Sequence, residues 1–137
     1  MGRSIVTGRR QDFKGFTFVE LVMVITILGT LVAIAIPVYR AQILASKESV
    51  LQHNLAILRE RIDQYKADRD EYPPSLSALV DAGYLREIPV DPMTDRTEWE
   101  EVFAEFDPER PEQEPGVYDI HSLSGGVGSD GRTYSEW

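Results

Sequence analysis

A single long block of apolar residues dominates the hydropathy pattern of this 137-residue chain. From Leu21 to Val38, 18 consecutive residues carry no charge, and counting from Phe16 adds only one charged side chain, Glu20. A membrane-spanning helix needs roughly 20 predominantly apolar residues. The pattern therefore predicts a membrane-spanning helix near the start of the chain, in which Pro37 is tolerated and introduces a kink.

Beyond Pro37 the apolar residues recur on one side of a helix only. They follow spacings of 4, 3, 4 and 3 residues, at Leu51, Leu55, Leu58, Ile62 and Tyr65. Charged residues fill the other positions, which is typical of an amphipathic helix with one buried stripe. We expect one continuous helix from Phe16 to about Lys66, apolar all round in its first half and on one face in its second.

Shorter elements are expected after this helix, because Tyr72-Pro73-Pro74 prevents its continuation. Ser75 is a predicted N-cap of a short helix whose apolar face is Leu76, Leu79 and Val80, and Gly83 suits the position just after its end. A Pro-punctuated loop is expected to follow.

Two later segments are predicted to be strands, Trp99 to Phe106 and Val117 to His121, joined by the acidic, Pro-rich loop 107–116. As an antiparallel pair they would cover the stripe of the long helix. The Gly- and Ser-rich tail, Ser122 to Trp137, ends in aromatic residues that we expect to clip it onto this small folded part. The predicted fold class is thus α+β.

Charge is distributed unevenly along the chain. The formal net charge is −9, but residues 1–15 alone carry +3, so the remainder carries −12. An acidic domain without a basic patch argues against nucleic-acid binding. A basic start before an apolar run places the N-terminus on the cytoplasmic side of a membrane. The chain has no cysteine, which excludes disulfides and thiolate chemistry.

An ordinary secretory signal peptide is the competing interpretation of the apolar block, since Ala33-Ile34-Ala35 resembles a cleavage site. Three features disfavour it. The block is longer than the usual 7–15 residues, it contains the carboxylate of Glu20, and helical periodicity continues past the supposed cut.

Glu20 is the chemically unusual residue of the block. A carboxylate at membrane depth costs about 2.5 kcal/mol or more unless it is paired or protonated. One alternative is that Glu20 lies at the headgroups. The other is that it pairs with a cation, and cleavage after Gly15 would create one: the α-amine of Phe16, four residues before Glu20.

The segment Lys14–Val24 resembles the class III signal of type IV pilins and pseudopilins. The resemblance implies cleavage between Gly15 and Phe16 by a prepilin peptidase, N-methylation of Phe16, and pairing of Glu20 with the N-terminus of a neighbouring subunit. Pro37 matches the family's common helix-kinking proline. The implied fold is pilin-like, with a long N-terminal helix, a short helix, a small antiparallel sheet and a C-terminal loop.

Further motifs resemble the G-type major pseudopilin of type II secretion, among them Asp70-Glu71-Tyr72-Pro73, Gly83-Tyr84-Leu85 and the closing Tyr118–Ser122 with its Gly-rich tail. The alternative within the family is a type IV pilin for adhesion, motility or DNA uptake. Pilins usually close their C-terminal region with a disulfide, which this chain cannot form.

The resemblance implies a structural filament subunit rather than an enzyme. Residues 1–15 would be the leader, 16–39 the membrane-spanning and filament-core half-helix, and 40–137 an extracytoplasmic head. Expected partners are further copies of the chain, the prepilin peptidase, minor pseudopilins, an assembly platform of the inner membrane, and lipid. We expect a single-pass protein of the cytoplasmic membrane, with its head outside the cytoplasm.

Many G-type pseudopilins bind calcium in the last loop through several Asp carboxylates. Here that loop offers Asp130, with Asp119 and Glu136 farther off, whereas calcium takes 6–8 oxygen ligands. Asp119 and Asp130 are the candidate calcium ligands. The alternative is a loop held by packing of Tyr134 and Trp137, with no cofactor.

Catalytic chemistry finds little support in the sequence. His53 and His121 are isolated histidines, and Ser122 and Ser124 lie outside any nucleophile-elbow motif. A membrane-anchored enzyme or binding domain remains the alternative from another class of protein, but an anchor alone does not require Phe16 and Glu20 at their positions.

Overall fold

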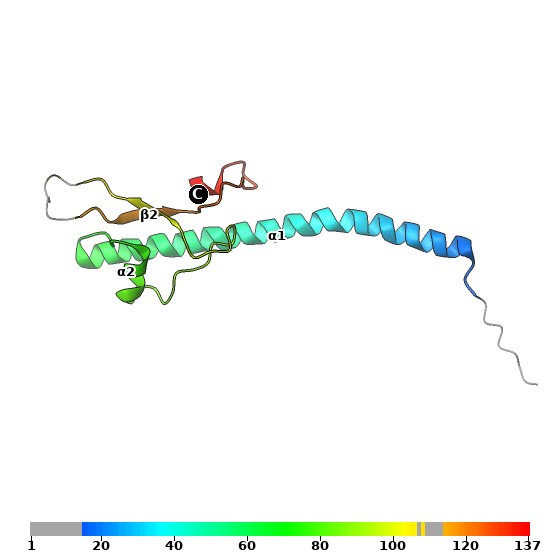
Figure 1. The fold of residues 1–137 in the computed structure, drawn as a ribbon, viewed down its shortest axis with the longest axis horizontal. Helices are drawn as coiled ribbons and strands as arrows, with labels where there is room; N and C mark the ends of the chain where they lie inside the picture. Colours follow the sequence, from blue (N-terminus) through cyan, green and yellow to red (C-terminus); the bar gives the residue numbers. More distant parts are fainter. Residues whose placement is uncertain (1–14, 107, 109–113) are drawn as a thin grey trace, which may run out of the picture. The chain divides into compact units, whose positions relative to one another are not determined.

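The computed structural model describes residues 15–106, 108 and 114–137 (Figure 1). Apart from Gly15, the predicted leader lies outside the described residues, as does most of the acidic loop between the predicted strands. Contacts within the chain separate a unit that ends at Tyr39 from a second unit, Arg40–Trp137. Each unit is described by itself, and the second is called the head.

Helix α1, Phe18–Arg69, confirms the predicted long helix, with both ends two or three residues from their expected positions. Pro37 lies inside α1 and does not end it. Every described side chain from Gly15 to Ser46 is exposed, although this part of α1 has the hydropathy of a membrane span. Two threonine hydroxyls in this part donate to main-chain carbonyls one turn earlier: Thr26 to Val22 and Thr30 to Thr26, both at 2.8 Å.

The second half of α1 carries the core of the head. The predicted stripe is buried throughout, at Leu51, Leu55, Leu58, Ile62 and Tyr65. The other elements of the head contribute Leu76, Leu79, Trp99, Val117, Ile120 and Tyr134 to the same cluster. Spacings of 3 and 4 residues thus predicted correctly which side of α1 faces the core.

Helix α2, Leu76–Asp81, has the predicted caps. The Ser75 side chain accepts a hydrogen bond from the N–H of Ala78 at its start. Gly83 follows its end with φ +81°, a conformation that glycine adopts without steric cost. Leu76 and Leu79 turn its apolar face into the core, as expected.

Strands β1, Glu100–Phe103, and β2, Val117–His121, form the predicted antiparallel pair. β1 is shorter than predicted. Trp99 is buried and donates from its indole nitrogen to the carbonyl oxygen of Pro89 at 2.9 Å instead of extending the strand. An irregularity between Val102 and Phe103 disturbs the register near the other end. Together these elements confirm the predicted pilin-like α+β class.

Candidate functional site

The predicted processing site lies in non-helical backbone just before α1. Gly15 has no heavy atom within 4 Å of the position that a Cβ would occupy, and Phe16 is 84% exposed. A protease needs an accessible substrate backbone, and the bond between these residues lies outside the helix with an exposed residue on either side. Cleavage there and N-methylation of Phe16 stay predictions.

Thr17 and Glu20 form a reciprocal cap at the start of α1. The main-chain N–H and the hydroxyl of Thr17 donate to Glu20 Oε2 at 2.9 and 3.0 Å, and the N–H of Glu20 donates to Thr17 Oγ1 at 3.2 Å. This is capping-box geometry, in which two otherwise unpaired N–H groups find side-chain acceptors. Within the described part of the chain, all of these bonds to the carboxylate use Oε2, so Oε1 remains available to another donor.

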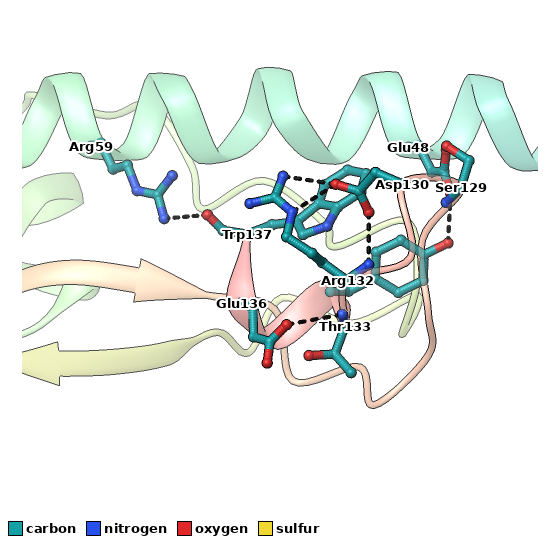
Figure 2. A network of polar contacts seen from close by, with 9 residues as sticks. Glu48, Arg59, Ser129, Asp130, Arg132, Thr133, Glu136 and Trp137 are labelled. Atoms are coloured by element: carbon teal, nitrogen blue, oxygen red, sulfur yellow. Dashed lines mark hydrogen bonds and ion pairs between the residues drawn. The ribbon is translucent and has the colours of Figure 1, made fainter.

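A second polar centre lies in the head, where the C-terminal loop, Ser122–Trp137, meets α1 (Figure 2). Glu48 of α1 is only 6% exposed. Its carboxylate accepts hydrogen bonds from the main-chain N–H and hydroxyl of Ser129, at 2.7 and 2.6 Å, and from the hydroxyl of Tyr134 at 3.0 Å. A buried carboxylate is tolerated when it is hydrogen-bonded in this way. Glu48 therefore anchors the loop to the helix.

Electrostatics at this centre follow from those contacts. The Ser129 hydroxyl in particular lowers the pKa of Glu48, so the carboxylate stays charged at neutral pH. Burial, assisted by the hydrogen bond to Glu48, raises the pKa of Tyr134, so its phenol stays neutral and can donate. Tyr134 belongs to the buried core cluster and Trp137 packs against that cluster, which confirms that the aromatic residues hold the tail onto the head; their rings pack edge-on at a centroid distance of 5.2 Å.

The candidate calcium ligand Asp119 lies in β2 and is bonded to Arg59 of α1. Arg59 Nε donates to Asp119 Oδ1 at 2.7 Å, and the N–H of Ile120 donates to the same oxygen at 2.8 Å. Arg59 Nη2 also donates to the main-chain oxygens of Ile120 and Trp137, at 3.1 and 2.7 Å. Asp119 thus helps to hold an arginine that joins helix, strand and loop.

The other candidate ligand, Asp130, is bonded to Arg132. Its Oδ2 lies 2.8 Å from Arg132 Nε and 2.7 Å from Nη2, and its Oδ1 accepts from the N–H of Arg132 at 3.0 Å. That main-chain N–H, followed by the guanidinium, lowers the pKa of Asp130. Among the described residues, no three His, Asp or Glu side chains gather in a metal-binding group. The donor set therefore does not fit a calcium ion, which wants several carboxylates together.

The His and Ser residues near the end of β2 do not form a catalytic set. Ser122 is buried and donates to the buried carboxylate of Asp91 at 2.6 Å. His121 Nε2 lies 3.6 Å from Asp119 Oδ2, on the carboxylate that Arg59 also holds. The Ser122 hydroxyl is thus hydrogen-bonded to a carboxylate, with no histidine as its base.

Several contributing residues were not singled out in the sequence. Thr17 had a local signal, because Thr-x-x-Glu before an apolar run is a capping-box pattern. Glu48 and Arg59 had none, because their partners lie 60 to 86 residues away in the chain. Charged residues on a helix are ordinarily solvated. Only the fold of the head shows that these charged residues of α1 bind other parts of the chain instead.

Comparison with known proteins agrees with these features. Residues 10–36 match the family model of the prokaryotic N-terminal methylation motif. The chain is 29% identical over 140 residues to type II secretion system core protein G of Pseudomonas aeruginosa, covering 90% of this chain and 89% of the relative. It is 33% identical to the core protein G of Aeromonas hydrophila over 104 residues, covering 61% and 68%. No solved structure matches the chain.

A fimbrial protein of Eikenella corrodens, EcpC, is also similar, at 30% identity over 86 residues, but the match covers 59% of this chain and 56% of that protein. The core G proteins match over larger shares of their own lengths. They belong to a family of structural subunits rather than of enzymes, and the apolar half of α1 fits membrane anchoring. The chain therefore belongs to the type II secretion system core protein G family, and the pseudopilin interpretation of its sequence is confirmed over the type IV pilin alternative.

Proposed function

We propose that the chain is the filament-forming subunit of a type II secretion apparatus and that it assembles through the N-terminal half of α1 after its leader is removed. The observation that carries this proposal is Glu20, a carboxylate held in the first turn of a helix whose following apolar surface is wholly exposed. The similarity to core G proteins supplies the secretion system.

Processing is the first step. The prepilin peptidase hydrolyses the exposed Gly15–Phe16 bond, and the new α-amine of Phe16 is methylated. In the precursor this nitrogen is a neutral amide. After the cut it is a cation one residue before the capping box of Thr17 and Glu20.

Assembly is the second step. The amine of one mature subunit pairs with Glu20 of a neighbour, whose Oε1 is not used by the capping box. Two unit charges 4 Å apart attract far more strongly in an apolar medium than in water. The pair sets the axial register, and exposed side chains such as Ile25 and Leu28 exchange their lipid contacts for close packing against other copies.

Before assembly the apolar half of α1 lies in the cytoplasmic membrane. The positive leader keeps the N-terminus in the cytoplasm, and the head lies on the outer side. Minor pseudopilins and the assembly platform of the inner membrane are the further partners, and extension of the filament drives export of folded proteins.

Replacing the carboxylate tests the proposal. In cells that carry the other secretion components, Glu20→Ala is expected to leave leader removal intact but to abolish filaments recovered by shearing. Glu60→Ala, an exposed glutamate later on α1, is the control and should assemble normally. Normal filaments from Glu20→Ala would contradict the pairing.

A further inference from the structure

Arginine side chains hold the C-terminal loop and the strand before it. Arg59 donates to two oxygens of β2, Asp119 Oδ1 at 2.7 Å and the Ile120 carbonyl at 3.1 Å, and to the main-chain oxygen of Trp137 at the end of the loop, at 2.7 Å. A guanidinium offers five N–H donors in a rigid fork around one positive charge. Here it collects one carboxylate and two main-chain oxygens, a mixture of ligands that calcium also takes.

Arg132 plays the same part at the tip of the loop (Figure 2). Its guanidinium contacts Asp130 Oδ2 through Nε and Nη2, at 2.8 and 2.7 Å, and its main-chain N–H donates to Asp130 Oδ1 at 3.0 Å. The turn itself needs Gly131, whose φ is +84°. The acidic side chain of the tip is thus neutralised by a residue two positions away.

The remaining acidic groups of the region are also hydrogen-bonded within the protein. Glu48 accepts three hydrogen bonds from the loop, and Glu136 Oε2 accepts one from the N–H of Thr133 at 3.2 Å. At the base of the loop, Asp91 accepts from Ser122 at 2.6 Å and from the N–H of Met93 at 2.8 Å. Every carboxylate of the region therefore already has protein donors.

We propose that the guanidinium groups of Arg59 and Arg132 close the C-terminal loop of this pseudopilin in place of a calcium ion, so that the stability of the head does not depend on calcium. A divalent cation at Asp119 or Asp130 would lie beside an arginine and would have to displace it, because like charges at contact distance repel. The carboxylates of the region are also spread over separate arginine and serine partners rather than turned toward one point.

The test is thermal unfolding of the full mature chain in detergent micelles, with calcium chloride or with a chelator, and with magnesium chloride as the ionic-strength control. The same melting temperature is expected in all three solutions, and calorimetric titration should show no saturable binding of calcium. A melting temperature several degrees higher in calcium than in magnesium, or stoichiometric calcium binding, would overturn the proposal.

Variants of the two arginines test whether their guanidinium groups stabilise the head. Arg59→Gln should lower the melting temperature by several degrees equally with calcium and with chelator, and Arg59→Lys should restore only part of the loss because ammonium lacks the planar fork. Arg61→Gln is the matched control, since Arg61 contacts Gln64 on the exposed side of the same helix. If Arg59→Gln does not fold, Arg132→Gln at the exposed tip replaces it. Wild-type stability in either of these variants would contradict the role of that arginine.

Discussion

The Glu48 carboxylate accepts two hydrogen bonds from Ser129, a residue 81 positions later, at 2.7 and 2.6 Å. This contact joins the middle of α1 to the C-terminal loop. It also explains a glutamate that is buried in a helix whose other acidic side chains are exposed. Apolar packing fixes which side of α1 faces the core, and this polar contact fixes where along α1 the loop is attached.

Removal of the carboxylate should loosen the loop. Glu48→Ala leaves the Ser129 N–H and the buried Tyr134 hydroxyl without their acceptor, and we expect a loss of about 3 kcal/mol in the free energy of unfolding. The exposed control Glu60→Ala should change it by less than about 0.5 kcal/mol. Urea unfolding followed by tryptophan fluorescence measures both, and equal stabilities of the two variants would contradict the anchoring role.

Acid should weaken the same anchor. The pKa of Glu48 lies below its ordinary value of 4.5 in the folded head, chiefly because of the Ser129 hydroxyl. The unfolded chain therefore takes up the proton at higher pH, so the contribution is complete above pH 4.5 and is lost as pH falls through the folded pKa. Between about pH 6 and pH 3, Glu48→Gln should show a shallower fall in unfolding free energy than the wild type. Parallel curves would show that Glu48 does not contribute.

Two glycines offer a paired test of packing in the head. A Cβ on Gly116 would lie 2.5 Å from the carbonyl oxygen of Tyr72, whereas nothing lies within 4 Å of one on Gly125. Gly116→Ala should lower stability by about 1–3 kcal/mol or more, because backbone must shift to make room. Gly125→Ala should leave the melting temperature nearly unchanged. A larger loss of stability from Gly125→Ala than from Gly116→Ala would contradict the close contact between Gly116 and Tyr72.

The capping box should matter for assembly. Thr17→Val removes the hydroxyl that holds Glu20 in the first turn, while Thr17→Ser keeps it. A lost N-cap costs about 1 kcal/mol, so we expect roughly fivefold less filament from Thr17→Val and wild-type levels from Thr17→Ser. Immunoblots of sheared filaments measure assembly, and the mass of the cell-bound subunit verifies processing. Equal filament yields from the two variants would exclude a role for the hydroxyl.

Periodicity predicted most of the fold because its signals are local. Leu51 and Leu55 show which face of α1 is buried, and Ser75 marks where α2 starts. The predicted β1 is too long, because residues typical of strands, such as Trp99, can also pack in a core outside a strand. The Trp99 indole does so here and donates its hydrogen bond to the carbonyl oxygen of Pro89. The true end of β1 follows from the register with β2, which no single segment reveals.

The polar framework of the head was beyond sequence reasoning. Arg59 looks like any charged residue of an amphipathic helix, and its contact with Trp137 depends on how the chain returns to α1. Asp119 and Asp130 are candidate calcium ligands from sequence, as acidic residues near a Gly-rich loop. Only the folded head shows that each is bonded to an arginine. By contrast, the roles of Gly15, Phe16 and Glu20 are predictions that sequence alone can make, because their spacing before an apolar run is itself the signal.

If this chain acts as a processed filament subunit, the intact mass of the protein purified from membranes will show it. We expect the loss of residues 1–15 and the addition of one methyl group, carried by an N-terminal Phe16 in the fragmentation spectrum. An unprocessed precursor, or a chain cut after Ala35, would contradict it.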